Sequence, residues 1–456
     1  MKLQKSFIYL LLAFLTIGSY SCRRDAPKSE ISTQVTQVKH PDWSKDVSIY
    51  EVNVRQFTPE GTFQALEAHL PRIKELGTDI IWLMPIHPIG EKNRKGTLGS
   101  YYSIKDYYGI NPEFGDSASF KSFVDRAHKE GLKVILDWVA NHSAWDNALV
   151  TEHPEFYAKD STGQMYAPFD WTDVVKFNFE VPEMRQYMLD AMKYWIQEFD
   201  IDGYRCDVAG EVPMDFWDNA RTELDKIKPV FMLAEAEGPQ FHSAFDMTYG
   251  WEFHHIMNKI YKGEAKPNDI EAYLKKNDSL YPEDSYRMYF ITNHDENSWA
   301  GTEFERLGNG VESFFALSAV IPGMPLVYSG QEAPLQKRLE FFEKDPIDWD
   351  NYQKAEFYQT ILDLKSSHPA LYNGKEGGTW QRVATDNDDK VFAILRQKGT
   401  QQVVGVFNLS GEEVTVALND ENLRQNFKTL FASESITIDE FTRIKLPPWS
   451  YKILYR

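Results

Sequence analysis

The chain has 456 residues and a formal net charge of -19, because 68 acidic side chains outnumber 49 basic ones. This length suits one α/β barrel with an appendage, and the acidic excess argues against a nucleic-acid-binding surface. With only two cysteines, a disulfide framework is excluded.

The N-terminus predicts a signal peptide over residues 1–22. Lys2 and Lys5 precede an apolar run from Phe7 to Ile17 that is too short to span a bilayer. Small residues then lead into Cys22, and "SYSC" resembles the lipobox of a bacterial lipoprotein signal. The resemblance implies that Cys22 becomes a lipidated first residue, whereas plain secretion with cleavage nearby is the alternative. Residues 23–45 are polar and predict a flexible tether.

From residue 46 onward, apolar segments alternate with amphipathic helical segments. Strands are predicted at residues 47–57, 79–85, 132–141, 201–207, 230–235, 244–249, 287–293 and 325–330. Helices are predicted at residues 63–77, 119–131, 182–200, 213–228, 310–323 and 352–371. Continuous apolar strands between helices indicate a parallel sheet buried on both faces. Eight of them predict a closed (β/α)₈ TIM barrel, of the α/β class, and the sixth has the weakest pattern.

Two further units are predicted around this barrel, which we place at residues 46–371. The segment after the third strand, 143–180, is too long for a simple connection and predicts a small excursion domain. Residues 372–456 instead alternate apolar and polar side chains between turn signals. This pattern predicts a C-terminal antiparallel β-sandwich.

Acidic side chains gather at the ends of the predicted strands, where functional residues of a parallel barrel cluster. Asp207 ends the fourth strand, Glu235 the fifth, and Asp295 follows the seventh. An isolated acid at such a place is commonly a helix cap or an ion-pair partner, but their joint convergence on one rim points to chemistry. Carboxyls in different environments are what cleavage of a glycosidic bond requires.

Arg205 and Asp207 lie two positions apart on a strand, so their side chains point the same way. The cation is expected to favour the ionised form of Asp207 and to orient it as a nucleophile. Glu235 follows the apolar run "FMLA", so a less solvated setting would raise its pKa and keep it an acid.

Four motifs in order carry a family resemblance. "DWVANH", "GYRCD", Glu235 after "VFMLA", and "NHD" resemble the four ordered sequence regions of the α-amylase family, glycoside hydrolase family 13. "LGSYYSIKDYYGINPEFG" is similar to the family's segment between the second and third strands. The resemblance runs from about Asp46 to the end of the chain, since the family usually carries a C-terminal β-domain.

The resemblance implies catalytic roles for three acids. Asp207 is similar to the family's nucleophile and Glu235 to its general acid/base. Asp295 is similar to the carboxylate that grips the sugar hydroxyls and stabilises the transition state. Arg205 would orient the nucleophile.

Further positions are implied as substrate and metal ligands. His142 and His294 would donate or accept hydrogen bonds with hydroxyls of the glucose being cleaved, and Tyr102 would stack against its ring. Asn141 matches a position that in many members binds a structural calcium ion, so calcium is a possible cofactor.

The sequence also departs from the family pattern. Gly210 and Glu211 stand where many α-amylases carry a Lys-His pair, so a contact on the leaving-group side is absent and the calcium site is in doubt. "AEGP" follows Glu235, which makes Glu237 a second candidate acid, although Glu235 is preferred because it ends the apolar run.

The function expected from the resemblance is a retaining α-amylase (EC 3.2.1.1 type) that cleaves α-1,4-glucosidic bonds of starch-like glucans by double displacement. A cyclomaltodextrinase, neopullulanase or transglycosylase of the same family is one alternative, and a non-catalytic glycan-binding lipoprotein is another. The expected partners are an α-glucan and, through the lipid anchor, a membrane of a diderm bacterium, periplasmic or at the cell surface. Endo or exo action and oligomeric state are left open.

Overall fold

A computed structural model describes residues 37–432 and 434–456 of the chain. The predicted signal peptide and the first part of the tether lie outside these residues. Within the described part, no helix has the length and apolar character needed to cross a bilayer.

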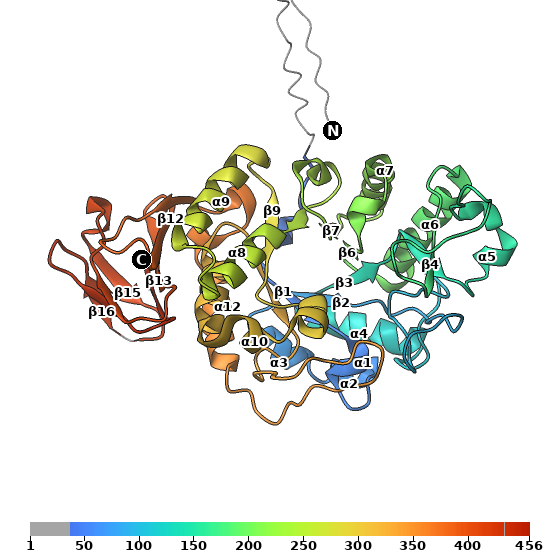
Figure 1. Ribbon diagram of the computed structural model, residues 1–456, viewed down its shortest axis with the longest axis horizontal. Coiled ribbons are helices and arrows are strands. Elements are labelled where there is room, and N and C mark those ends of the chain that lie inside the picture. The colour runs from blue at the N-terminus through green and yellow to red at the C-terminus, as the bar shows by residue number, and fades with distance from the viewer. Residues whose placement is uncertain (1–36, 433) are drawn as a thin grey trace, which may run out of the picture. The chain divides into compact units, whose positions relative to one another are not determined.

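Eight parallel strands close into a barrel, as predicted (Figure 1). Their order around the barrel is β1, β2, β3, β6, β7, β8, β9 and β10, which pairs again with β1. Their bounds are β1 Ile49–Val52, β2 Ile80–Leu83, β3 Lys133–Trp138, β6 Gly203–Cys206, β7 Phe231–Ala234, β8 Met247–Tyr249, β9 Tyr286–Tyr289 and β10 Met324–Tyr328. The strand with the weakest pattern, β8, has only three residues.

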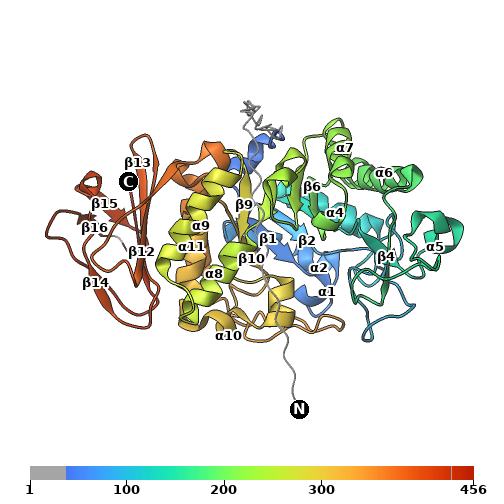
Figure 2. The same ribbon diagram turned by 45° about the horizontal axis from the view of Figure 1, so that its top comes forward.

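Helices surround the barrel (Figure 2). Their bounds are α1 Val54–Phe57, α2 Phe63–Glu67, α3 Leu70–Glu75, α4 Ser117–Lys129, α5 Leu149–Glu152, α6 Pro182–Phe199, α7 Met214–Asp225, α8 Trp251–Tyr261, α9 Pro267–Leu280, α10 Glu303–Leu307, α11 Val311–Val320 and α12 Ala355–Ser367. The larger ones turn apolar side chains toward the strands, which is why their sequences are amphipathic.

Two predicted elements are interrupted in the structure, and several others are shorter than predicted. The strand expected over 47–57 ends at Val52, because the side chain of Asn53 accepts a hydrogen bond from the backbone N–H of Arg55 and starts the short helix α1. The helix expected over 63–77 is divided into α2 and α3. Pro71 lies in the first turn of α3, and a proline cannot continue a preceding helix because it lacks the amide hydrogen.

Side chains fill the interior of the barrel, so it is a packed core and not a channel. They form one buried cluster: Val47, Ile49, Ile80, Trp82, Ile135, Phe231, Leu233, Met247, Tyr249, Tyr286, Met288, Phe290, Met324 and Leu326. Asp207 and Glu235 directly follow β6 and β7, at the rim formed by the carboxyl ends of the strands.

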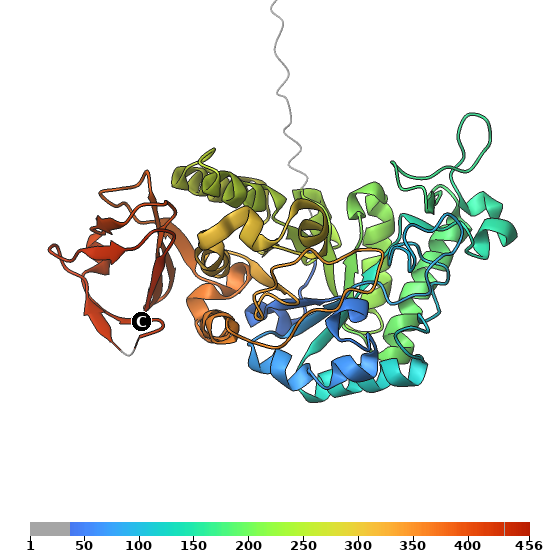
Figure 3. The same cartoon turned by 60° about the horizontal axis from the view of Figure 1, so that its bottom comes forward.

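The segment after β3 leaves the barrel and returns. It begins with β4 (His142–Ala144) and closes with β5 (Val174–Lys176), which pairs with β4 in antiparallel fashion. The helix α5 lies between them, and Figure 3 shows this excursion and the C-terminal strands at opposite sides of the barrel.

The C-terminal part is an antiparallel β-domain, as predicted. Its six-stranded sheet has the order β11, β12, β13, β18, β15, β16, and β14 pairs with β17. The bounds are β11 Thr379–Arg382, β12 Val391–Lys398, β13 Gln401–Asn408, β14 Val414–Val416, β15 Asn426–Thr429, β16 Ser435–Thr437, β17 Ile444–Leu446 and β18 Tyr451–Tyr455. The sheet packs against α11, which is buried at every residue except Glu312.

Candidate active site

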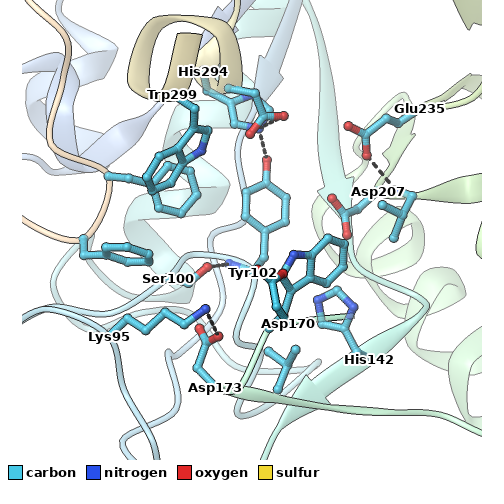
Figure 4. Close-up of a pocket in the computed structure, with 16 residues that line it drawn as sticks. Lys95, Ser100, Tyr102, His142, Asp170, Asp173, Asp207, Glu235, His294 and Trp299 are labelled. Carbon is cyan, nitrogen blue, oxygen red and sulfur yellow. Dashed lines mark hydrogen bonds and ion pairs between the residues drawn. The ribbon is translucent and has the colours of Figure 1, made fainter. Parts of the chain in front are cut away.

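Three acids from three strand ends line one cavity of about 360 Å³ (Figure 4). Asp207 follows β6, Glu235 follows β7, and Asp295 lies a few residues after β9. The backbone N–H of Asp207 donates to Trp138 O at 3.0 Å and that of Glu235 to Cys206 O at 3.1 Å. These bonds extend the strand ladders by one residue, so the barrel itself holds the two carboxyl groups.

The buried guanidinium of Arg205 joins the acids. Its Nη1 lies 2.9 Å from Asp137 Oδ1 and 3.1 Å from Asp207 Oδ1, and its Nη2 forms an ion pair with Glu235 Oε1 at 2.9 Å. The predicted ion pair between Arg205 and Asp207 is thus present. The same cation also holds Glu235, which the sequence pattern did not indicate.

The pKa values of the two acids follow from burial and mutual repulsion. Burial raises the pKa of Asp207, the charge of Glu235 raises it further, and Arg205 opposes both effects. Burial also raises the pKa of Glu235, against the influence of Arg205. Burial and the charge of Glu235 thus outweigh Arg205 at Asp207, contrary to the expectation that the cation favours the ionised form. The two carboxyls repel each other and face one cation, so they titrate as a coupled pair.

Glu235 has a second stabilising contact that sequence reasoning missed. The backbone N–H of Val208 donates to Glu235 Oε2 at 2.7 Å. Val208 has a φ of 36°, a left-handed conformation that is rare for a β-branched residue. Strain of this kind is typical of functional sites, and here it accompanies the N–H that contacts the carboxyl of the proposed acid.

His294 is cationic at neutral pH. Its Nδ1 donates to Glu51 Oε1 at 2.5 Å, and its Nε2 lies 2.8 Å from the hydroxyl of Tyr102 and 3.3 Å from Asp295 Oδ2. Burial by itself would lower the pKa of His294, but the carboxylates of Asp295 and Glu51 raise it to about 9. The imidazolium therefore anchors Asp295 and Tyr102 at the edge of the cavity.

Tyr102 and His142 form further parts of the lining. The Tyr102 ring stacks on His294 and on Phe341, with ring centroids 5.6 and 6.2 Å away, and its hydroxyl donates to Asp137 Oδ2 at 3.0 Å. Burial lowers the pKa of His142 to about 3, so its ring is uncharged near pH 7. All seven predicted catalytic and substrate-contacting residues thus lie in or directly behind this cavity, while their roles stay predictions.

Asn141 lies behind His142 and donates to its Nδ1 at 3.2 Å. The Oδ1 of Asn141 is buried without a hydrogen-bond partner, as an unused ligand atom would be. Calcium, however, takes six to eight oxygen ligands that include carboxylates. Lys176, a cation, pairs with the adjacent His142 across the hairpin, and the described residues contain no cluster of three or more His, Cys, Asp or Glu that could hold a metal ion. This donor set does not fit calcium, so no metal enters the mechanism below.

The second candidate acid, Glu237, does not line the cavity. Its Oε1 lies 2.8 Å from Arg287 Nη2, in an ion pair outside the site. Glu211, one of the two residues in place of the Lys-His pair, forms an ion pair with Lys176 of β5 at 3.3 Å. That contact joins the excursion to the loop after β6.

Several lining residues were missed because they come from loops with no periodic pattern: Lys95, Ser100, Asp170, Asp173, Phe341 and Phe342. Glu51 was also missed, although a buried acid within the apolar strand β1 was a usable signal. Trp171, in the excursion, and Trp299, in the π-helical turn Glu296–Ala300, also line the cavity.

Comparison with known proteins agrees with this geometry. The family model for the alpha amylase catalytic domain matches residues 32–161 and 155–403, and the model for the maltogenic amylase C-terminal domain matches residues 381–453. The chain belongs to the α-amylase family.

Within this family, a solved maltogenic α-amylase, AmyB from Thermotoga neapolitana, is 32% identical with a TM-score of 0.82, covering 90% of this chain and 98% of that one. The α-amylase MalA of Haloarcula japonica is 28% identical over 83% of this chain, which spans only 57% of that relative's length. The maltogenic α-amylase of Bacillus acidopullulyticus is 25% identical over 91% of this chain and 78% of that protein. Further relatives at 24–26% identity are named cyclomaltodextrinase and neopullulanase.

Proposed function

We propose that this α-amylase-family protein hydrolyses α-1,4-glucosidic bonds of starch-like glucans and maltooligosaccharides with retention of anomeric configuration. The observation that carries the proposal is that Asp207, Glu235 and Asp295 line one cavity while Arg205 holds the first two together. Two carboxyls on one guanidinium provide the close nucleophile and acid of a double displacement.

In the first step, the Asp207 carboxylate attacks the anomeric carbon and forms a glycosyl ester. The bond to the departing oxygen breaks, and the proton of Glu235 moves to that oxygen. In the second step, Glu235, now ionised, removes a proton from water, whose oxygen displaces Asp207 from the sugar. Both residues return to their starting state.

The contacts of Glu235 serve this exchange. Once Glu235 has given up its proton, the Val208 N–H and the Arg205 guanidinium stabilise its anion. As Asp207 loses its charge to the new ester, Arg205 remains paired with the new charge on Glu235. Because Arg205 contacts both carboxyls, it stabilises the negative charge on whichever of the two carries it.

Asp295 and its neighbours would hold the sugar. About a third of the Asp295 side chain is exposed to solvent, and it stays oriented by the His294 imidazolium. Tyr102 offers a ring face to the cavity, and its hydroxyl is fixed by Asp137 and His294. Because these groups already have hydrogen-bond partners, they would keep their positions when the sugar ring binds.

For specificity, we propose a maltogenic-amylase type in preference to an endo-acting α-amylase. The supporting observations are the match of the C-terminal domain to that of maltogenic amylases and the 32% identity to a maltogenic α-amylase. The relatives named cyclomaltodextrinase and neopullulanase keep that specificity as the second candidate. Product profiles on starch, pullulan and cyclodextrins separate the two.

The test of the proposed chemistry uses maltooligosaccharides and proton NMR. The first-formed reducing sugar is expected to be the α-anomer, and a β-anomer would exclude double displacement. Asp207→Asn is expected to reduce kcat by at least about 10⁴-fold, as loss of a nucleophile does in other enzymes. Asp215→Asn, an exposed acid on α7 paired with Arg185, is the matched control and should keep wild-type activity. A non-catalytic glycan-binding protein would show no turnover in the wild type or in Asp207→Asn.

We also propose that Cys22 carries a lipid that tethers the enzyme to a membrane, facing the periplasm. The support is the sequence pattern of residues 1–22, and the residues after Cys22 carry no dense acidic patch. Detergent phase partitioning of the expressed full chain tests this: the wild type should enter the detergent phase and Cys22→Ala the aqueous phase. Equal partitioning of both would contradict the anchor.

A further inference from the structure

A second cavity, of about 420 Å³, lies outside the barrel, between β9, α9 and the first strands of the C-terminal domain. α9 and β12 lie side by side there (Figure 1, Figure 2). None of the residues that line this cavity lines the active-site cavity. Along β9, Tyr286 and Met288 belong to the barrel interior. Arg287 and Tyr289 alternate with them, so they point outward and form part of the wall of the second cavity.

Arg396 of β12 lines this cavity as a cation without an acidic partner. Its side chain is 1% exposed, and its Nη1 and Nη2 donate to the carbonyl oxygens of Val320 and Gly378, at 2.7 and 3.1 Å. Its Nε has no hydrogen-bond partner, and no acid among the described residues forms an ion pair with it. Burial without a counter-ion lowers the pKa of Arg396 to about 10. Buried charges are normally paired, so this guanidinium points to an anionic ligand.

The other polar atoms left without a partner around this cavity are also mainly donors. Arg287 Nε, on β9, and Asn277 Nδ2, on α9, are buried and have no hydrogen-bond partner among the described residues. Ser285 Oγ, which can donate or accept, is in the same position. Tyr289 lies near both guanidinium groups, because its hydroxyl raises the pKa of Arg287 and of Arg396. This wall therefore suits a ligand that accepts hydrogen bonds and carries negative charge.

The acids around the cavity do not supply that charge. Asp278 and Glu283 line it, but both are exposed to solvent and neither forms an ion pair with Arg396. Lys375, an exposed lining cation, is already paired with Asp284, its Nζ 2.5 Å from Asp284 Oδ2. The charge of Arg396 is thus left uncompensated by the side chains of this wall.

We propose that this cavity binds a phosphate group, held between Arg396 on the C-terminal sheet and Asn277 and Arg287 on the barrel side. Phosphate oxygens only accept hydrogen bonds when ionised, and a guanidinium is the side chain whose planar set of donors matches them. The cavity is larger than a phosphate ion, so it also has room for a sugar ring attached to the phosphate. The ligand class is therefore inorganic phosphate or the phosphate ester of a small saccharide. This inference does not depend on the proposed hydrolysis.

The experiment is isothermal titration calorimetry of the purified full chain with inorganic phosphate, glucose 6-phosphate and glucose, in a buffer without other oxyanions. Inorganic phosphate and glucose 6-phosphate are expected to bind. Arg396→Gln should weaken both at least about tenfold, because a hydrogen bond to a charged group is lost. Asn277→Ala removes a donor on α9 and should weaken both as well. Arg424→Gln, at an exposed arginine of the C-terminal domain that does not line the cavity, is the matched control and should bind as the wild type does.

The outcomes distinguish the two sources of phosphate. Tighter binding of glucose 6-phosphate than of inorganic phosphate would identify a phosphorylated saccharide as the ligand, and equal or weaker binding would identify free phosphate. If neither compound binds the wild type, or if Arg396→Gln leaves their binding unchanged, the inference is overturned. Glucose that binds with the same dependence on Arg396 would replace it with a site for neutral sugars. If Arg396→Gln does not fold, Asn277→Ala and Ser285→Ala carry the test, and unchanged affinity in both would refute the site.

Discussion

At the scale of single residues, the site is a cluster of buried charges whose members depend on one another. Arg205 is fully buried and forms ion pairs with Asp137, Asp207 and Glu235. His294 forms ion pairs with Glu51 and Asp295. Burying such groups costs stability unless each finds a partner. Removing one member therefore changes the protonation of those that remain.

Glu51→Gln tests this dependence through pH. The folded-state pKa of His294, about 9, is above the ordinary value of 6.5, so its charge stabilises the fold fully below about pH 6.5. That stability is lost as the pH rises through 9, by up to about 1.4 kcal/mol for each pH unit. Glu51→Gln lowers the folded-state pKa of His294, so the total loss should be smaller and should be complete at a lower pH than in the wild type.

The measurement is the melting temperature from pH 6 to 10, with NMR titration of the His294 ring. Glu340→Gln, an exposed acid in the loop after β10, is the control and should follow the wild-type curve. An unchanged alkaline limb in Glu51→Gln would contradict the coupling.

At the scale of secondary-structure elements, the hydrophobic pattern predicts the strands and therefore the residues that directly follow them. Asp207 and Glu235 directly follow strands of buried apolar residues, so their place on the rim could be inferred from the eight-strand pattern. Lys95 and Asp173 could not be inferred in this way, since they belong to loops whose course depends on contacts distant in sequence. The capping side chain of Asn53 and the proline at Pro71 are local signals that outweighed the periodic pattern.

The hairpin of β4 and β5 bears on whether the protein needs a calcium ion. Lys176 of β5 forms an ion pair with Glu211 after β6, which joins the excursion to the barrel without a cation from solution. We expect treatment with EDTA to leave activity and melting temperature unchanged. A fall in either that added calcium restores would contradict this prediction and favour calcium at Asn141.

At the scale of the whole described molecule, the barrel and the C-terminal sheet share one hydrophobic core. Phe407 of β13 belongs to the same buried cluster as Phe314 and Phe315 of α11. Arg396 of β12 also donates to Val320 O at the end of α11, at 2.7 Å. The sheet therefore supports the helix that precedes β10.

Phe407→Ala tests this support at a distance from the active site. The cavity is expected to cost about 3–5 kcal/mol. The temperature of half-inactivation, measured as residual hydrolysis after heating, should fall by several degrees, while KM at low temperature stays unchanged. Phe441→Ala, at a side chain that is 81% exposed, is the matched control and should have no effect. Full retention of heat resistance in Phe407→Ala would mean that the two parts unfold independently.

Lys95 and Asp173 belong to two loops that line the cavity, whereas the proposed catalytic acids Asp207 and Glu235 directly follow β6 and β7. Substitutions in these surface segments can therefore reshape the cavity wall while the strand ends keep the acids in place.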